Sequence, residues 1–168
     1  MDKVFIESGY KFDFSGGISA IIADKPNYSG LSAVDFIVET KDEFLFIEIK
    51  NPDNPKSNEN ERKVFLEALK SELFPYQMSG KFKDTLLCRW AFDEQYNKPI
   101  RYIILLQFDR FGKAERGRLK TKILGRLPSG LNKKEFKRRI NIWGFNLVDI
   151  DEFGKEFPVF TVSKVEIA

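Results

Sequence analysis

Residues 33–52, with the sequence AVDFIVETKDEFLFIEIKNP, constrain the fold more than any other part of the chain. Two runs rich in Val, Ile and Phe flank a polar break at 40–43, which is the pattern of two strands joined by a tight turn. If Lys41 and Asp42 form the turn, the numbers of paired residues sum to 83, and Asp35 lies directly across from Glu48. A loop over 40–43 keeps this register, whereas a loop shorter or longer by one residue would shift it.

The predicted hairpin carries charged residues on a face that is otherwise apolar. Side chains alternate between the two faces of a strand, so Glu48 and Lys50 point the same way, and Asp35 joins them because opposed residues share a face. The other residues of that face are Ile37, Phe44 and Phe46. The opposite face carries Val34, Phe36, Val38, Leu45, Ile47 and Ile49. We therefore expect helices to cover the hairpin on both sides, and buried charge there to be paired or to hold a metal ion.

An Asp on one strand followed by Glu-x-Lys on the next resembles the PD-(D/E)xK nuclease superfamily. The resemblance implies that Asp35 and Glu48 bind the metal ion and that Lys50 is the catalytic lysine. The leading Pro of the motif is absent, since Ala33 and Val34 precede Asp35. As an order of elements, the resemblance covers roughly residues 12–108. It implies the restriction-endonuclease-like fold, an α/β single-domain sandwich over 1–168 whose central mixed β-sheet is flanked by helices.

The chemistry suits these residue types. Two carboxylates can hold Mg²⁺ or Mn²⁺ and leave coordination positions for water and a phosphate. Such an ion polarises the phosphoryl group and lowers the pKa of an attacking water, and a lysine beside it orients that water or stabilises developing negative charge. The resemblance thus implies a metal-dependent phosphodiesterase acting on DNA. Glu7 and Asp24 are candidates for a third acidic ligand, although a surface charge and a turn cap are the ordinary interpretations of these two residues.

Two further interpretations stay open at the level of sequence. Some superfamily members have lost activity, so the chain could be an inactive module that binds nucleic acid or a protein partner. Alternatively, Glu48 and Lys50 are an ordinary pair on a strand, Asp35 is an unrelated strand-end residue, and the chain is an interaction protein. Cation binding by Asp35 and Glu48 distinguishes the metal-dependent phosphodiesterase from both of these alternatives. DNA or RNA substrates, and endo- or exonucleolytic cleavage, are equally compatible with these residues.

Composition narrows the possible chemistry and location. The 168 residues include no His and a single cysteine, Cys88, which excludes imidazole catalysis, zinc ligation by His and an internal disulfide. A hydrophobic content of 42% with 17 Phe predicts one globular domain with a sizeable core. No apolar run approaches membrane-spanning length and no signal-peptide pattern opens the chain, so we expect a cytoplasmic protein that does not bind membranes.

Charge is distributed unevenly along the chain. Residues 110–139, the basic segment, carry 12 Lys or Arg and 2 acidic residues, a net +10 that leaves −7 for the rest of a chain whose total is +3. This indicates a surface that faces a polyanion, with a solvated helical face as the alternative. The candidate nucleic-acid contacts are Arg110, Lys133, Lys134, Lys137 and Arg138. If each chain holds one site and both strands of DNA are cut, a homodimer is expected.

The remaining pattern predicts helices and strands around the hairpin. Strands are expected over 10–14, 18–23, 99–108 and 141–150, with an edge strand over 157–167. Helices are expected over 60–74, 80–95, 114–127 and 133–139. Pro75 is expected to end the first of these helices and Ser79 to cap the second, which places Lys81 and Lys83 in a first turn. Asp149, Asp151 and Glu152 are expected to lie in a loop.

Overall fold

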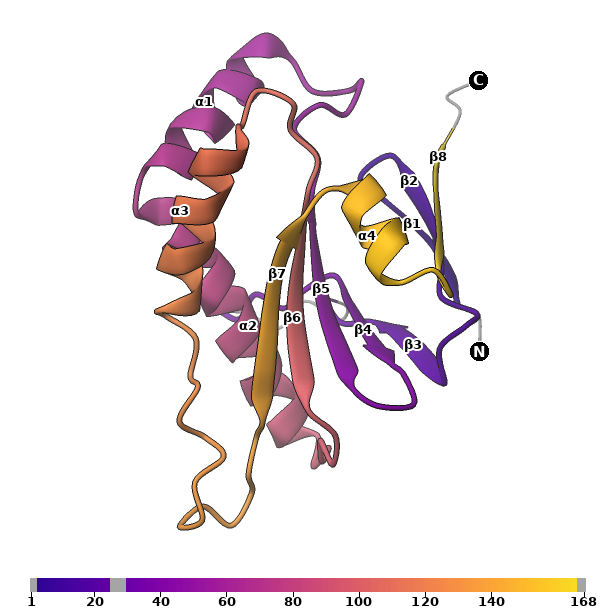
Figure 1. Cartoon of the computed structure of the whole chain (residues 1–168), viewed down its shortest axis with the longest axis vertical. Helices are drawn as coiled ribbons and strands as arrows, with labels where there is room; N and C mark the ends of the chain where they lie inside the picture. Colours follow the sequence, from indigo (N-terminus) through magenta and orange to yellow (C-terminus); the bar gives the residue numbers. More distant parts are fainter. Residues whose placement is uncertain (1–2, 25–29, 166–168) are drawn as a thin grey trace.

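The computed structural model describes residues 3–24 and 30–165 and has an α/β architecture with two sheets and four helices in that part of the chain (Figure 1). The larger sheet is mixed, because β3, β4 and β5 pair antiparallel whereas β5, β6 and β7 pair parallel. In spatial order its strands are β3 Ser19–Ile22, β4 Phe36–Glu39, β5 Phe44–Lys50, β6 Ile100–Leu106 and β7 Ile142–Val148. The predicted central mixed sheet is therefore confirmed.

A second, antiparallel sheet joins the two ends of the described chain. Its strands, in spatial order, are β1 Val4–Glu7, β2 Tyr10–Asp13 and β8 Thr161–Lys164. The strand expected over 157–167 is confirmed as an edge strand, although it is shorter than predicted, and residues 166–168 lie outside the described part. The strand expected over 10–14 forms, but it belongs to this second sheet.

The two faces of the five-stranded sheet are covered differently (Figure 1). Three helices cover one face, α1 Glu59–Lys70, α2 Leu73–Ala91 and α3 Lys113–Leu124. The second sheet and the short helix α4 Ile150–Glu156 cover the other face. The expectation of helices on both sides is thus confirmed only in part for this face, because α4 shares it with a sheet, and Phe12, Phe14 and Phe160 supply apolar surface beside Phe153 of α4. No helix in residues 3–24 and 30–165 is long and apolar enough to cross a membrane.

The hairpin of β4 and β5 has the predicted register. Phe36 pairs with Ile47, and Thr40 N donates to the Glu43 carbonyl at 2.9 Å, which leaves Lys41 and Asp42 as the turn. The Thr40 hydroxyl stabilises this turn, since it accepts a hydrogen bond from Glu43 N at 3.1 Å and donates to the Glu43 carbonyl at 2.9 Å. A side chain thereby supplies the bonds that tighten a turn lacking Asn-Gly.

The predicted faces of the hairpin are confirmed, with one exception. Ile37 and Phe46 pack toward the helices, whereas Phe36 and Ile47 pack toward the second sheet. Val34 is predicted to join the second group but packs on the helical side. It precedes the first residue of β4, so strand alternation does not govern it.

Two predicted helix boundaries differ from the observed ones. Pro75 does not end a helix, because α2 begins at Leu73 and Pro75 lies in its first turn, where a missing amide hydrogen costs nothing. Ser79 is therefore an interior residue of α2 rather than a cap. Helix α1 begins at Glu59, one residue before the predicted start at residue 60, and Asn58 caps it while Glu61 completes a capping box.

Two predictions in the second half of the chain are wrong. Residues 133–139 form turns and irregular structure rather than a helix. Most of these residues are charged, so few apolar side chains are available to pack and offset the cost of nucleating a short helix. The prediction of a loop for Asp149, Asp151 and Glu152 is the second, because Asp151 and Glu152 lie in the first turn of α4. Asp149 caps α4, and its carboxylate accepts a hydrogen bond from Glu152 N at 2.8 Å.

Candidate active site

Glu48 is the most deeply buried charged residue of the hairpin, with no solvent exposure. It lies in β5, two positions before Lys50, and its side chain points toward α2. Two ammonium groups neutralise its carboxylate. Lys50 Nζ donates to one oxygen, and Lys81 Nζ lies 2.8 Å from that oxygen and 3.0 Å from the other. A charge placed this deeply in the sheet is tolerated because both oxygens are paired.

Asp35 lies beside Glu48, one position before β4, and the strand register places the two residues opposite each other. One Asp35 oxygen accepts a hydrogen bond from Ile49 N at 2.6 Å. Burial, and then repulsion from the Glu48 carboxylate, raise the pKa of Asp35 from 3.8 to about 7. The two carboxylates are therefore close enough to disfavour simultaneous ionisation, which is the electrostatic signature of a pair that attracts a proton or a cation.

Lys50 ends β5 and completes the predicted triad. Burial disfavours its ammonium, but the charge of Glu48 and its hydrogen bond outweigh that cost, so the pKa of Lys50 lies above its ordinary value. Asp35 and Glu7 add smaller contributions in the same direction. The structure thus brings Asp35, Glu48 and Lys50 together at one end of the β4–β5 hairpin, as the sequence predicts.

Lys81 is the member of this cluster that the sequence prediction places incorrectly. The pattern predicts it in the exposed first turn of a helix, but it lies in the middle of α2 with only 19% of its side chain exposed. Moving the start of the helix to Leu73 puts Lys81 on the same side as Met78 and Phe82, which are buried against the sheet. If Pro75 is assigned to the first turn of the helix, the helical spacing of residues 78, 81 and 82 predicts that Lys81 faces the sheet.

A hydrogen-bond chain through Thr85 fixes the position of α2 relative to Asp35. The fully buried Thr85 hydroxyl donates to the Lys81 carbonyl at 2.7 Å and accepts from Val34 N at 2.9 Å. Val34 directly precedes Asp35, so one side chain of the helix holds the backbone beside the carboxylate. Sequence reasoning misses Thr85, because a helical threonine gives no signal of such a contact.

A pocket of about 630 Å³ opens next to the cluster. The residues that line it are Gly30, Ser32, Lys50, Tyr76, Gln77, Met78, Gly80, Lys81 and Asp84. Neither Asp35 nor Glu48 is among these lining residues, so the two lysines stand between the carboxylates and the pocket. Gln77, which falls between the two predicted helices, lies in α2 and reaches this pocket.

The carboxylate pair fits a hard divalent cation by the chemistry of its donors. Asp35 and Glu48 supply buried carboxylate oxygens on adjacent strands, and burial followed by repulsion from Glu48 raises the pKa of Asp35 although Lys81 and Lys50 lie close by. Within residues 3–24 and 30–165, no third Asp, Glu, Cys or His joins them in a group that could hold a metal. Glu7 acts on Lys50 from β1, and Asp24 is an exposed residue after β3, so neither provides the predicted third ligand.

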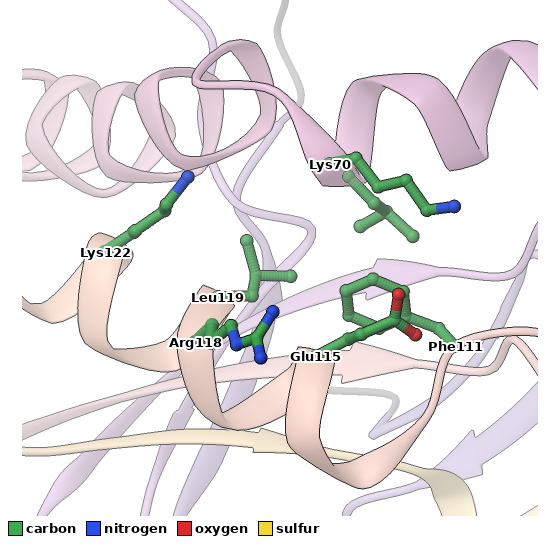
Figure 2. A pocket seen from close by; sticks show the side chains of 7 residues that line it. Lys70, Phe111, Glu115, Arg118, Leu119 and Lys122 are labelled. Atoms are coloured by element: carbon green, nitrogen blue, oxygen red, sulfur yellow. The ribbon is translucent and has the colours of Figure 1, made fainter.

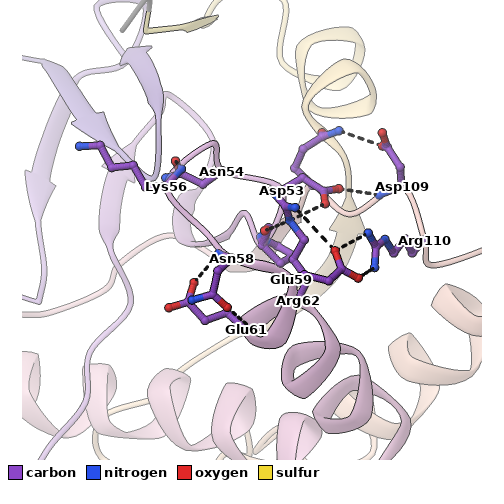
Figure 3. A network of polar contacts seen from close by, with 11 residues as sticks. Asp53, Asn54, Lys56, Asn58, Glu59, Glu61, Arg62, Asp109 and Arg110 are labelled. Carbon is purple, nitrogen blue, oxygen red and sulfur yellow. Dashed lines mark hydrogen bonds and ion pairs between the residues drawn. The ribbon is translucent and has the colours of Figure 1, made fainter.

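The basic segment is divided between the two ends of the sheet. Arg110 follows β6 at the end where the carboxylates lie, but its guanidinium donates to both oxygens of Glu59, at 2.6 Å and 2.9 Å (Figure 3). Arg62 and Asp53 extend this polar network at the start of α1. A phosphate would have to compete with Glu59 for Arg110, which makes this residue a weaker candidate than its sequence position indicates.

The other candidate contacts lie far from the carboxylate pair. Residues 125–141 form the loop between α3 and β7 (Figure 1), and Asn141 accepts a hydrogen bond from Ile100, the first residue of β6. Lys50 instead pairs with Leu106, the last residue of that strand. Lys133, Lys134, Lys137 and Arg138 are exposed on this loop, and Arg138 is paired with Asp93 at 2.5 Å. The length of the sheet thus separates this group of cations from Lys50.

A further pocket, of about 320 Å³, lies between α1 and α3 (Figure 2). Leu69, Phe111 and Leu119 form its apolar part, and Lys70, Glu115, Arg118 and Lys122 surround them. It shares no lining residue with the pocket beside Lys50 and Lys81. Glu115 completes the capping interaction of α3, and Lys122 pairs with Glu72, so several of its charges already have structural partners.

Comparison with known proteins finds no matching protein-family model, no matching curated protein and no matching solved structure.

Proposed function

We propose that this chain is a divalent-metal-dependent phosphodiesterase that acts on DNA and has a restriction-endonuclease-like fold. The observation that supports the proposal best is the juxtaposition of two buried carboxylates, Asp35 and Glu48, with Lys50 on one end of a hairpin in a mixed sheet. The adjacent pocket, which Lys50 and Lys81 line, offers positive charge to a phosphate group. Metal-assisted hydrolysis of a phosphodiester can use these three components together, namely a cation site, a positively charged side chain and an open space for the substrate.

Each residue has a separate role in this proposal. Asp35 and Glu48 would hold Mg²⁺ or Mn²⁺, which supplies Lewis-acid polarisation of the phosphoryl group and a water of lowered pKa. In the cation-free protein, Glu48 raises the pKa of Lys50, so Lys50 carries its proton before the cation binds. Its role would be that of a hydrogen-bond donor that orients the attacking water or stabilises negative charge on the phosphate. Asp35, with a pKa of about 7, is the carboxylate on which a bound cation would replace a proton.

The test combines cation binding with cleavage. Mg²⁺ or Mn²⁺ is titrated by calorimetry into the wild type, Asp35→Asn/Glu48→Gln, and the control Asp42→Asn/Glu67→Gln, which changes two exposed carboxylates elsewhere. We expect binding in the wild type and control and none in the site variant. Plasmid, linear and branched DNA are then incubated with the wild type, Lys50→Ala and Lys83→Ala. Folded Lys50→Ala should lose cleavage, while exposed Lys83 should be dispensable; full activity of Lys50→Ala contradicts its role.

A second candidate function rests on a specific contact. The Glu48 carboxylate is already neutralised by Lys50 and Lys81, so the cluster needs no cation to remain folded. A non-catalytic module that binds nucleic acid or a protein partner would be compatible with this arrangement. It predicts salt-dependent DNA binding without cation binding at Asp35 and Glu48, and the calorimetric titration distinguishes it from the phosphodiesterase.

A further inference from the structure

Lys81 occupies a position that a simple surface lysine would not. Its ammonium crosses from the middle of α2 to β5 and contacts both oxygens of Glu48, at 2.8 Å and 3.0 Å. A divalent cation held by the same carboxylate would approach those oxygens too. Glu48 is already paired with both Lys50 and Lys81, so a divalent cation on the same carboxylate would add further positive charge beside them, and Lys81, which contacts both oxygens, would compete with it.

The surroundings of Lys81 allow its side chain to move while its backbone stays fixed. Its carbonyl is held by the Thr85 hydroxyl at 2.7 Å, and α2 is packed against the sheet through Met78 and Phe82. The ammonium, by contrast, ends a flexible four-carbon stem that lines the pocket of about 630 Å³. Rotation of this stem would move the ammonium from the Glu48 carboxylate into the pocket without any movement of the helix.

We propose that Lys81 is an exchangeable counter-ion of Glu48. In the cation-free protein it neutralises Glu48, and when a divalent cation binds the carboxylates, the Lys81 ammonium turns into the pocket and binds a phosphate of the DNA strand. This inference rests on the function proposed above. It assigns Lys81 two successive partners, a carboxylate and then a phosphate, whereas Lys50 remains with Glu48. The exchange also couples the two ligands, since cation binding releases the group that binds the phosphate.

The first test measures cation affinity directly. Mn²⁺ is titrated by calorimetry, without DNA, into the wild type, Lys81→Met and the matched control Lys83→Met, which removes an exposed lysine from the same helix. Because the competing ammonium is gone, we expect Lys81→Met to bind Mn²⁺ at least about tenfold more tightly than the wild type, the factor expected from one charge-assisted hydrogen bond. The control should match the wild type. Equal or weaker binding by Lys81→Met overturns the inference.

The second test measures the phosphate partner. A dinucleotide with a single phosphorothioate linkage is titrated into the Mn²⁺-saturated proteins, and we expect Lys81→Met to bind it at least about tenfold more weakly than the wild type and Lys83→Met. Unchanged affinity overturns the assignment of Lys81 to the phosphate. If Lys81→Met does not fold, Lys81→Gln removes the charge and keeps a hydrogen-bond donor to Glu48, and the same two comparisons apply.

The outcomes separate this inference from the proposed function. If neither the wild type nor Lys81→Met binds Mn²⁺ at millimolar concentration, the metal-dependent function fails, and the inference fails with it. If the wild type binds Mn²⁺ through Asp35 and Glu48 but Lys81→Met binds it no more tightly, the proposed function stands and only the counter-ion role is rejected.

Discussion

Glu48 and Lys81 are 33 positions apart in the sequence, yet the Lys81 ammonium spans both oxygens of the fully buried Glu48 carboxylate. This contact joins the helical layer to the centre of the sheet through charge rather than through apolar packing. Such a pair adds little net stability when compared with two apolar residues, but removing Lys81 leaves Lys50 as the remaining ammonium beside Glu48, and removing Glu48 leaves the partly buried Lys81 without this carboxylate. Its energetic contribution is therefore measurable as a coupling between the two residues.

A double-mutant cycle measures this coupling. We expect Glu48→Gln and Lys81→Met each to lower the free energy of unfolding by about 1–3 kcal/mol. The double variant should lose less than the sum of the two, with a coupling energy of about 0.5–3 kcal/mol, because neither partner is then left alone. Urea denaturation followed by circular dichroism gives the four free energies. Lys83→Met, the control, should change stability by less than about 0.5 kcal/mol, and strictly additive effects would contradict the pairing of Glu48 with Lys81.

The stability of the cation-free protein should depend on pH through Asp35. Its pKa is about 7 in the folded state against 3.8 as the ordinary value, so the folded chain binds more protons between these pH values. Stability therefore falls as pH rises from about 4 to about 7, and the loss from this group is on the order of 2–4 kcal/mol.

Asp35→Asn should remove this decrease, because the amide oxygen still accepts from Ile49 N and carries no charge. Urea denaturation between pH 4.5 and pH 8, with a chelator present, should show the variant gaining stability relative to the wild type as pH rises. Parallel curves for the two proteins would mean that Asp35 ionises without cost in the folded state.

Thr85→Val tests the link between α2 and the strand entry. The substitution keeps the shape of the side chain but leaves the Val34 amide, which is bonded to Thr85 Oγ1 at 2.9 Å, without that acceptor. We expect a loss of about 1–3 kcal/mol in the free energy of unfolding, together with weaker cation binding, because Val34 directly precedes Asp35. Thr121→Val is the matched control, since that exposed hydroxyl donates to a carbonyl of its own helix, Gly117, at 3.1 Å. Equal effects of the two substitutions would exclude a special role for Thr85.

The exposed lysines of the basic segment should act on DNA affinity rather than on cleavage. We expect Lys133→Gln/Lys134→Gln/Lys137→Gln to lower affinity for any DNA sequence, because each lysine that neutralises a phosphate releases a counterion from the DNA. The slope of log affinity against log salt should become shallower by about 2–3, which is one unit or slightly less for each lysine removed.

Fluorescence anisotropy between 50 mM and 200 mM salt measures this slope. The control variant Lys11→Gln/Lys63→Gln/Lys155→Gln removes the same charge from exposed positions outside the basic segment. If both triple variants show the same change in slope, only net charge matters, and the basic segment has no particular role in binding.

The hairpin and the placement of its charged residues could be predicted because they depend on local information. A polar break flanked by apolar runs defines the turn, and strand alternation then determines which side chains share a face. Asp35, Glu48 and Lys50 accordingly lie together, as expected. Val34 departs from the predicted face because it lies outside β4, where a contact with Thr85 of α2 decides its orientation.

The contribution of α2 could not be predicted because the position of one proline is ambiguous in the sequence. Pro75 inside a helical pattern usually ends the helix, but the same residue is tolerated in a first turn, and only the tertiary packing of Phe74 and Met78 shows which applies. The second sheet could not be predicted for a different reason. Its strands β2 and β8 are far apart in the sequence, and no local pattern indicates that Phe12 pairs with Val162.

The separation between Lys50 and the exposed lysines of residues 133–137 sets a minimum length for a ligand that reaches both. Strand β6 has 7 residues between these two ends of the sheet, and at about 3.3 Å per residue it spans roughly 20 Å. Base pairs in a duplex rise by about 3.4 Å, so the same distance corresponds to about 6 base pairs. If the chain cleaves duplex DNA as proposed, its footprint should extend at least this far to one side of the cleaved bond. Duplexes truncated below that length should then bind without the contribution of the loop while keeping that of the carboxylate site.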